Sequence, residues 1–193
     1  MSTMPARKGA QINNPLTETR TMRPKNAMPE APKMYETEND LPKAARTQLN
    51  PLINQRLADA VDLQIQLKQA HWNVKGPHFI GLHELFDKIS EEVESYVDMI
   101  AERVVQLGGI AQGTVRMAAA HSRLEEYPLE IADGVLHVEA VAKALSTFGR
   151  EARATIDEAG ALEDADTADL FTEISRGIDK WLWFVEAHSQ APK

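Results

Sequence analysis

Apolar residues recur at steps of three and four positions along most of the chain after residue 50. This spacing places them on one face of a helix, and it therefore predicts amphipathic helices. Four segments with this period follow one another, ending near residues 75, 107, 159 and 188. Since no segment has the two-residue alternation of a half-buried strand, the pattern predicts an all-α fold.

Glycine and proline residues mark where these helices end. The first three helices are expected to stop at Gly76–Pro77, Gly108–Gly109 and Gly160. The start of the first helix has two interpretations, because Asp40 precedes Pro42 and Asn50 precedes Pro51 in the manner of helix N-termini. Either Pro51 kinks one long helix, or it opens the helix that actually forms.

The remaining helices are expected over about 79–107, about 131–159, and from Asp166 or Thr167 to near His188. Residues 110–130 are less periodic, and their short apolar piece at 117–121 leaves room for one short helix before a break at Pro128. The sequence thus predicts a four-helix bundle with one long crossover between its second and third helices. That topology is associated with ferritin-like folds.

Composition narrows the class of protein and the chemistry open to it. A chain of 193 residues with 43% apolar content suits one globular domain. It has no apolar run of membrane-spanning length and no apolar leader after its first basic residues, so we expect no membrane association and a cytoplasmic location. Because cysteine is absent, any metal must bind to oxygen and imidazole ligands.

Residues 1–39 differ from the rest of the chain. They hold five of its ten prolines and lack an apolar period, which predicts a flexible tail in front of a bundle domain at 40–190. Between Met1 and Lys33, six basic residues face two acidic ones, giving about +4. The whole chain carries −8, so the remainder carries about −12. The sequence therefore predicts a basic tail on an acidic body.

Two pairs of metal-binding residue types lie on the second predicted helix. His83 and Asp87 are four positions apart, as are Asp98 and Glu102, so each pair shares a helix face; His71 lies a short distance upstream. Eleven positions separate Asp87 from Asp98, which is roughly 16 Å along a helix axis. One ion bound by all five residues would therefore need a second copy of the chain, packed antiparallel about a two-fold axis. The spacing predicts a metal site at a dimer interface.

A simpler interpretation of the same residues is a solvated acidic helix face. Glu91 and Glu94 continue the polar stripe, and most such stripes bind nothing. Against this, imidazole with carboxylate at a four-residue step suits a first-row divalent metal, and like charges stacked along a helix repel one another unless cations offset them. The E-x-x-H element of metal sites within one bundle is absent, so an intrabundle di-iron centre is not expected.

Four segments resemble the Dps family of bacterial mini-ferritins: 69–76 (QAHWNVKG), 82–87 (LHELFD), 98–103 (DMIAER) and 179–184 (DKWLWF). The resemblance covers about residues 45–188 and excludes the tail. It implies a hollow dodecameric shell with two-iron ferroxidase centres at its two-fold interfaces. His71, His83 and Asp87 would come from one subunit, and Asp98 and Glu102 from its neighbour.

The same resemblance implies a function. Dps-like proteins oxidise Fe(II) with hydrogen peroxide or oxygen and store ferric mineral, which protects against oxidative stress; zinc or manganese would be competing ions. Trp72 would intercept stray oxidising equivalents, unless it is simply a packed interface aromatic. Asp166 and Asp169 would line an iron-entry pore, although acidic residues at a helix start are also ordinary capping residues.

The basic tail raises the question of DNA binding. Its residues Arg7, Lys8, Arg20, Arg23 and Lys25 could hold phosphates without sequence specificity, through many tails on one shell, which would place the protein at the nucleoid. Two functions are thus open: a ferroxidase and iron store, or mainly a structural nucleoid protein with a marginal metal site. The intact five-residue set favours the first.

Overall fold

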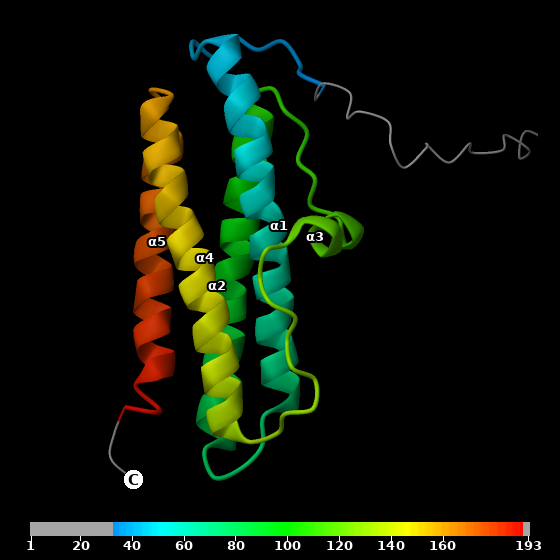
Figure 1. Ribbon diagram of the computed structural model, residues 1–193, viewed down its shortest axis with the longest axis vertical. Coiled ribbons are helices and arrows are strands. Elements are labelled where there is room, and N and C mark those ends of the chain that lie inside the picture. Colours follow the sequence, from blue (N-terminus) through cyan, green and yellow to red (C-terminus); the bar gives the residue numbers. More distant parts are fainter. Residues whose placement is uncertain (1–32, 191–193) are drawn as a thin grey trace, which may run out of the picture. The chain divides into compact units, whose positions relative to one another are not determined.

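The computed structural model describes residues 33–190, and that part of the chain contains five helices and no strand. They are α1 (Lys43–Asn73), α2 (Phe79–Gln106), α3 (Val115–His121), α4 (Gly134–Ala161) and α5 (Ala165–Glu186). The long helices pack as two hairpins, α1 with α2 and α4 with α5, and α1 also contacts α4 (Figure 1). The short α3 lies beside α1 in the crossover. The predicted all-α four-helix bundle, with one long crossover that carries a short helix, is confirmed.

The first helix is continuous through Pro51. It begins at Lys43, and Asn50 is a buried residue within it rather than its start. Pro51 is exposed, so its ring faces solvent and the helix passes it. Of the two interpretations of this region, the long helix is the correct one, and the start at Asn50 was wrong.

The starts of α4 and α5 are set by aspartate caps. Asp133 accepts a hydrogen bond from Val135 N at 2.8 Å, so α4 begins at Gly134, three residues later than expected. Asp164 accepts from Thr167 N at 3.0 Å, and α5 begins at Ala165. A side chain that satisfies free backbone donors fixes the first turn more sharply than apolar periodicity does.

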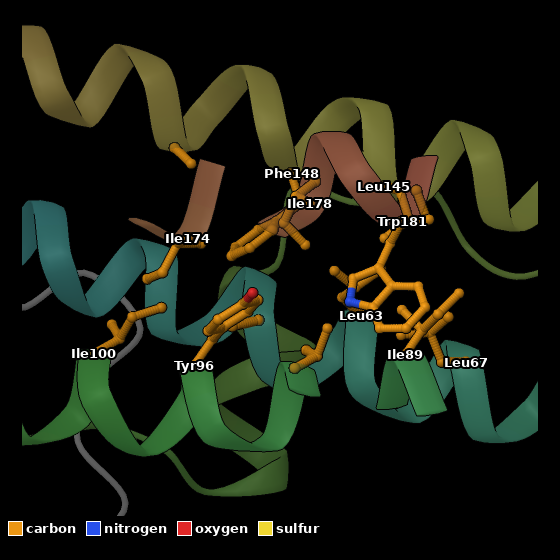
Figure 2. Packing of buried hydrophobic residues seen from close by; sticks show 14 of the residues in the cluster. Leu63, Leu67, Ile89, Tyr96, Ile100, Leu145, Phe148, Ile174, Ile178 and Trp181 are labelled. Carbon is orange, nitrogen blue, oxygen red and sulfur yellow. The ribbon is translucent and has the colours of Figure 1, made fainter. Parts of the chain in front are cut away.

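The core fills the space between the two hairpins. Trp181 of α5 points toward Leu63, Leu67 and Ile89 of the α1–α2 pair (Figure 2). The whole apolar row expected on α2 is buried: Leu82, Phe86, Ile89, Val93, Tyr96, Ile100 and Val104. Each fully buried side chain of this kind contributes about 1.5–3 kcal/mol. None of the described helices is long and apolar enough to cross a membrane.

Two buried charged residues of α1, Arg56 and Asp59, hydrogen-bond to α4 and to the crossover. Arg56 on α1 donates to Asp59 at 2.9 Å and to Thr155 on α4 at 2.7 Å. Asp59 also accepts the backbone N–H of Arg123 in the crossover at 2.8 Å. Arg56 and Asp59 are almost completely buried, and their charges are compensated by this pair together with Glu151, 3.3 Å from Arg56, and Arg123, 3.7 Å from Asp59.

The segment before α1 is extended and contacts the end of α2. Tyr35 N donates to Gly108 O at 2.7 Å, and Arg46 Nη1 donates to Leu107 O at 3.3 Å. Gly108 has φ +80, and a Cβ there would come within 2.5 Å of Tyr35 O. Glycine is therefore required where the segment crosses α2. The predicted boundary between tail and domain near residue 39 stays a prediction.

A tyrosine–histidine hydrogen bond fastens the crossover to α4. The Tyr127 hydroxyl and His137 Nδ1 are 2.7 Å apart, and both residues are buried. Burial lowers the pKa of His137 from its ordinary value of 6.5, because a charged imidazole would lose its hydration. The folded protein consequently holds this ring neutral in mildly acidic solution, where the unfolded chain takes up a proton.

His137 should therefore contribute to acid destabilisation. Below pH 6.5 only the unfolded chain gains this proton, so stability should fall by up to about 1.4 kcal/mol per pH unit until the folded-state pKa is reached. Above pH 6.5 the contribution is fully present and constant. Urea unfolding from pH 5 to 7.5 should show a flatter profile for His137→Gln than for the native chain. His121→Gln is the control, because His121 is exposed; equal slopes in all three proteins would contradict the expectation.

Candidate metal centre

Two histidines from different helices meet where α1 turns into α2. His71 lies near the end of α1, His83 lies in the second turn of α2, and the turn around Gly76 folds the second helix back beside the first. Gly76 has φ +107, which favours glycine. The two imidazole rings stack with centroids 3.7 Å apart and an interplanar angle of 20°.

Each of these imidazoles is held by the backbone of the other residue. His71 Nδ1 lies 2.7 Å from His83 O, and His83 Nδ1 lies 2.8 Å from His71 O. A carbonyl oxygen only accepts hydrogen bonds, so both Nδ1 atoms must carry the hydrogen. In the neutral rings, Nε2 then keeps its lone pair. This is the arrangement in which histidine serves as a metal ligand, with its other nitrogen fixed by a carbonyl.

Asp87 lies one turn after His83 on α2, and its carboxylate forms an ion pair with Lys68 of α1. Lys68 Nζ lies 2.5 Å from Asp87 Oδ1, whereas His71 Nδ1 is 3.9 Å from the same oxygen. The Lys68 ammonium holds the pKa of the Asp87 carboxyl below its usual value. Sequence reasoning missed Lys68, since its partner Asp87 lies on a different helix. A metal ion taking Asp87 as a ligand would have to displace this ammonium.

Asp98 and Glu102 do not join this group within one chain. Both are exposed on α2, three turns beyond Asp87. Among residues 33–190, no three histidine or acidic side chains come together in a way that could hold a metal ion. The structure thus brings together two of the five predicted ligands and places Asp87 beside them. It leaves Asp98 and Glu102 facing outward on the same helix.

The other residues singled out from the sequence have varied surroundings. Trp72 is 62% exposed, next to His71 in the chain. Asp166 and Asp169 are exposed in the first turns of α5, and Asp166 lies 4.0 Å from Arg103. The tail residues Arg7, Lys8, Arg20, Arg23 and Lys25 fall outside the described residues.

The turn before α5 contains a buried acid that sequence reasoning did not separate from its neighbours. Asp164 is 3% exposed and accepts a hydrogen bond from Arg103 Nη2 at 2.7 Å, while Arg103 Nε donates to Thr167 Oγ1 at 2.8 Å. Arg103 therefore fixes the start of α5 to the end of α2. The exposed Asp166 and Asp169 project from a helix whose position is set by this pair.

Comparison with known proteins places these features in a family. A model of the ferritin-like domain matches residues 51–192. A protein from Agrobacterium fabrum named "DNA protection during starvation protein" is 42% identical over 158 residues, covering 82% of this chain and 98% of the relative.

Solved structures agree with that match. DpsA14 from Streptomyces coelicolor superposes with a TM-score of 0.78 at 35% identity, covering 83% of this chain and 94% of that one. Dps from Mycobacterium smegmatis, in a tetragonal crystal form, gives a TM-score of 0.78 at 30% identity, with coverage of 82% and 96%. The structural match thus covers more than four fifths of this chain and nearly all of each of these two proteins.

Proposed function

Because this chain belongs to the Dps family of ferritin-like proteins, we propose that it is a ferroxidase and iron store that protects against oxidative stress. Its substrates are Fe(II) and hydrogen peroxide or oxygen, and its ferric product collects inside a closed homo-oligomeric shell, a dodecamer. The observation that carries the proposal is the pair of hydrogen bonds by which the Nδ1 atoms of His71 and His83 each contact the backbone carbonyl of the other residue. Both rings present Nε2 as a free ligand atom.

A second copy of the chain completes the proposed site. His71, His83 and Asp87 come from one subunit, and Asp98 and Glu102 from its partner across a two-fold axis. Support comes from the outward-facing carboxylates of α2 and from the roughly 16 Å that separates the two halves along one helix. An isologous dimer places each half opposite its complement, so two equivalent sites form at every interface.

The ligand chemistry suits iron oxidation. Imidazole nitrogen binds the entering Fe(II), and the hard carboxylates of Asp87, Asp98 and Glu102 stabilise Fe(III) more than Fe(II), which favours loss of the electron. Two Fe(II) ions give one electron each to one peroxide molecule, which takes up two protons and becomes two waters. Holding two irons at one site favours this pairing over one-electron cleavage, which releases hydroxyl radical. Zinc and manganese suit the same ligands and are the expected competitors.

The direct test is peroxide-driven iron oxidation. Anaerobic Fe(II) is added to the protein, peroxide follows, and ferric absorbance is recorded against a protein-free solution. The native protein should oxidise Fe(II) much faster than the protein-free solution, and Glu91→Gln with Glu94→Gln should not alter the rate, since these exposed residues lie on α2 outside the proposed site. A native rate equal to the protein-free rate would refute the ferroxidase function.

Lys68 should restrain metal binding at this site. Removing its ammonium in Lys68→Met frees Asp87 and eliminates a nearby positive charge, so Co(II), used as a redox-stable substitute for Fe(II), should bind roughly fivefold more tightly. The affinity is read from calorimetric or spectroscopic titration. Lys88→Met is the control, because Lys88 is exposed on α2. Unchanged affinity in Lys68→Met would show that the ion pair does not compete with the metal.

DNA binding is a second candidate, favoured by the concentration of positive charge before residue 34 and by the name of the Agrobacterium relative, which refers to DNA protection. The tail contacts would be to phosphates, and their affinity should fall steeply as salt rises. Gel shifts with the full chain and with a chain lacking residues 1–32 test it, since that deletion spares the contact between Tyr35 and Gly108. A shift that survives the deletion would exclude the tail as the binding element.

A further inference from the structure

A buried tyrosine and histidine, used by none of the roles above, form a hydrogen-bonded pair between the crossover and α4. The Tyr127 hydroxyl lies 2.7 Å from His137 Nδ1, with the ring centroids 6.0 Å apart. Tyr127 is 7% exposed and His137 is 1% exposed. Within the described residues, the His137 Nε2 atom has no hydrogen-bond partner.

Before any oxidation, the Tyr127 phenol and the His137 imidazole are both uncharged. Burial raises the pKa of Tyr127 and lowers the pKa of His137, so phenol and imidazole both stay uncharged near neutral pH. A phenol is a stronger acid than a neutral imidazole, so its O–H donates and Nδ1 accepts. The lone pair on Nδ1 is thus aligned with the phenolic proton.

We propose that Tyr127 and His137 form a one-electron donor that quenches strong oxidants. A one-electron oxidant takes an electron from Tyr127; the phenolic O–H bond breaks, and the proton forms an N–H bond at His137 Nδ1. The products are a neutral phenoxyl radical and an imidazolium. With hydroxyl radical as the oxidant, the electron converts it to hydroxide. One Fe(II) then returns an electron to the phenoxyl, the proton goes back from Nδ1, and Fe(III) is formed.

Three neighbouring groups offset part of the cost of a proton on the buried His137 ring. Burial opposes the protonated ring most strongly, and the Lys75 ammonium opposes it too, whereas the carbonyl groups of Ile131 and Asn73 and the carboxylate of Asp133 favour it. Without such an acceptor, oxidation of Tyr127 would leave a phenol radical cation in a buried place, at a large cost in lost hydration. Moving the proton along an existing hydrogen bond avoids that state.

Tyr127 can be approached from two sides while remaining covered. It lines a groove of about 550 Å³, together with Ile65, Val115 and Leu129, and a smaller pocket of about 240 Å³ with Lys143 of α4. Small oxidants that enter either cavity from solution therefore come close to the ring. Its low exposure limits attack by the phenoxyl on other molecules.

Tyr96 provides the internal comparison. It is also buried, and its hydroxyl donates to Glu92 Oε1 at 2.5 Å, but the ring lies between α2 and α5 in the core and lines neither cavity (Figure 2). The remaining tyrosine of the chain, Tyr35, is 52% exposed. Among the three, Tyr127 combines a buried imidazole acceptor with access from the surface.

The test uses the full assembled chain without iron or peroxide. Ruthenium(III) tris-bipyridine, generated by a light flash, is the one-electron oxidant, and freeze-quench electron paramagnetic resonance records tyrosyl radicals separately from tryptophan radicals. The oxidant source in the cell rests on the proposed ferroxidase function, but this experiment does not. Failure here and failure of iron oxidation are thus separate results.

The variants assign the radical. Tyr35→Phe with Tyr96→Phe leaves Tyr127 as the only tyrosine and should keep the tyrosyl signal, whereas Tyr127→Phe should reduce it at least about tenfold. In His137→Gln the radical should form roughly 100-fold more slowly, as expected when a positioned base is lost. The double variant leaves the pair intact, so it decides the matter even where Tyr127→Phe folds poorly. Loss of the signal in the double variant, or an unchanged rate in His137→Gln, would overturn the proposal.

Discussion

Two inactive versions of this chain should restore iron oxidation to each other when they assemble together. One version carries His83→Ala and Asp87→Ala, and the other carries Asp98→Ala and Glu102→Ala. Each alone should oxidise Fe(II) no faster than a protein-free solution, because every site in its shell lacks two of the five proposed ligands. Co-expressed at equal levels, they should recover about a quarter of the native number of sites.

The quarter follows from the two-fold geometry. In a mixed dimer, one of the two sites takes its histidine half from the second version and its acidic half from the first, and is intact; the other site is doubly damaged. Random pairing makes about half of the dimers mixed, and half of their sites work. If all five ligands acted within one chain, mixing could restore nothing.

Assembly must be verified in each protein, since lost oxidation is informative only in an intact shell. Sedimentation of the two versions and of their mixture should match the native protein. A mixture of separately purified shells, assayed immediately after mixing, is the matched control and should stay inactive. No recovery in a properly assembled mixed shell would contradict the shared site.

Replacing Arg103 with methionine should be the most destabilising of the substitutions considered for the helix bundle. The change leaves Asp164 buried without its cation, and breaking a buried pair on one side costs roughly 3–5 kcal/mol. Thr167 Oγ1 loses its donor at the same time. Urea unfolding should show the loss as a lower midpoint with an unchanged slope.

Arg153 offers the matched control. It pairs with Asp179 at 2.8 Å between α4 and α5, with both side chains about half exposed. Exposed pairs contribute about 0–1 kcal/mol, so Arg153→Met should unfold close to the native midpoint. Equal effects of the two substitutions would show that burial of Asp164 adds nothing to its interaction with Arg103.

The helices were predictable because their burial is periodic in sequence. The row from Leu82 to Val104 on α2 could be read directly, and it is buried as expected. The ends were less predictable, since the caps at Asp133 and Asp164 depend on single side chains. Buried charges were missed altogether: Arg56 and Asp59 resemble any surface pair until the fold places α4 and the crossover over them.

The candidate site was predictable only in part. The four-residue step from His83 to Asp87 and the distance to Asp98 came from helix geometry. That His71 lies against His83 depends on the angle of the turn at Gly76, which no periodicity encodes. Lys68 was missed because its pairing with Asp87 joins two helices, and charge complementarity across a turn leaves no pattern along the chain.

The reciprocal bonds between His71 and His83 also mean that these two residues are energetically coupled. Each ring is oriented by the main chain of the other residue, so a shift of either backbone releases both rings together. The rings also stack, with centroids 3.7 Å apart, so removing one imidazole takes away a packing contact of the other, and their contributions to metal affinity should be non-additive. The pair behaves as one chelating unit, and the turn that joins α1 to α2 is as much a part of that unit as the imidazoles are.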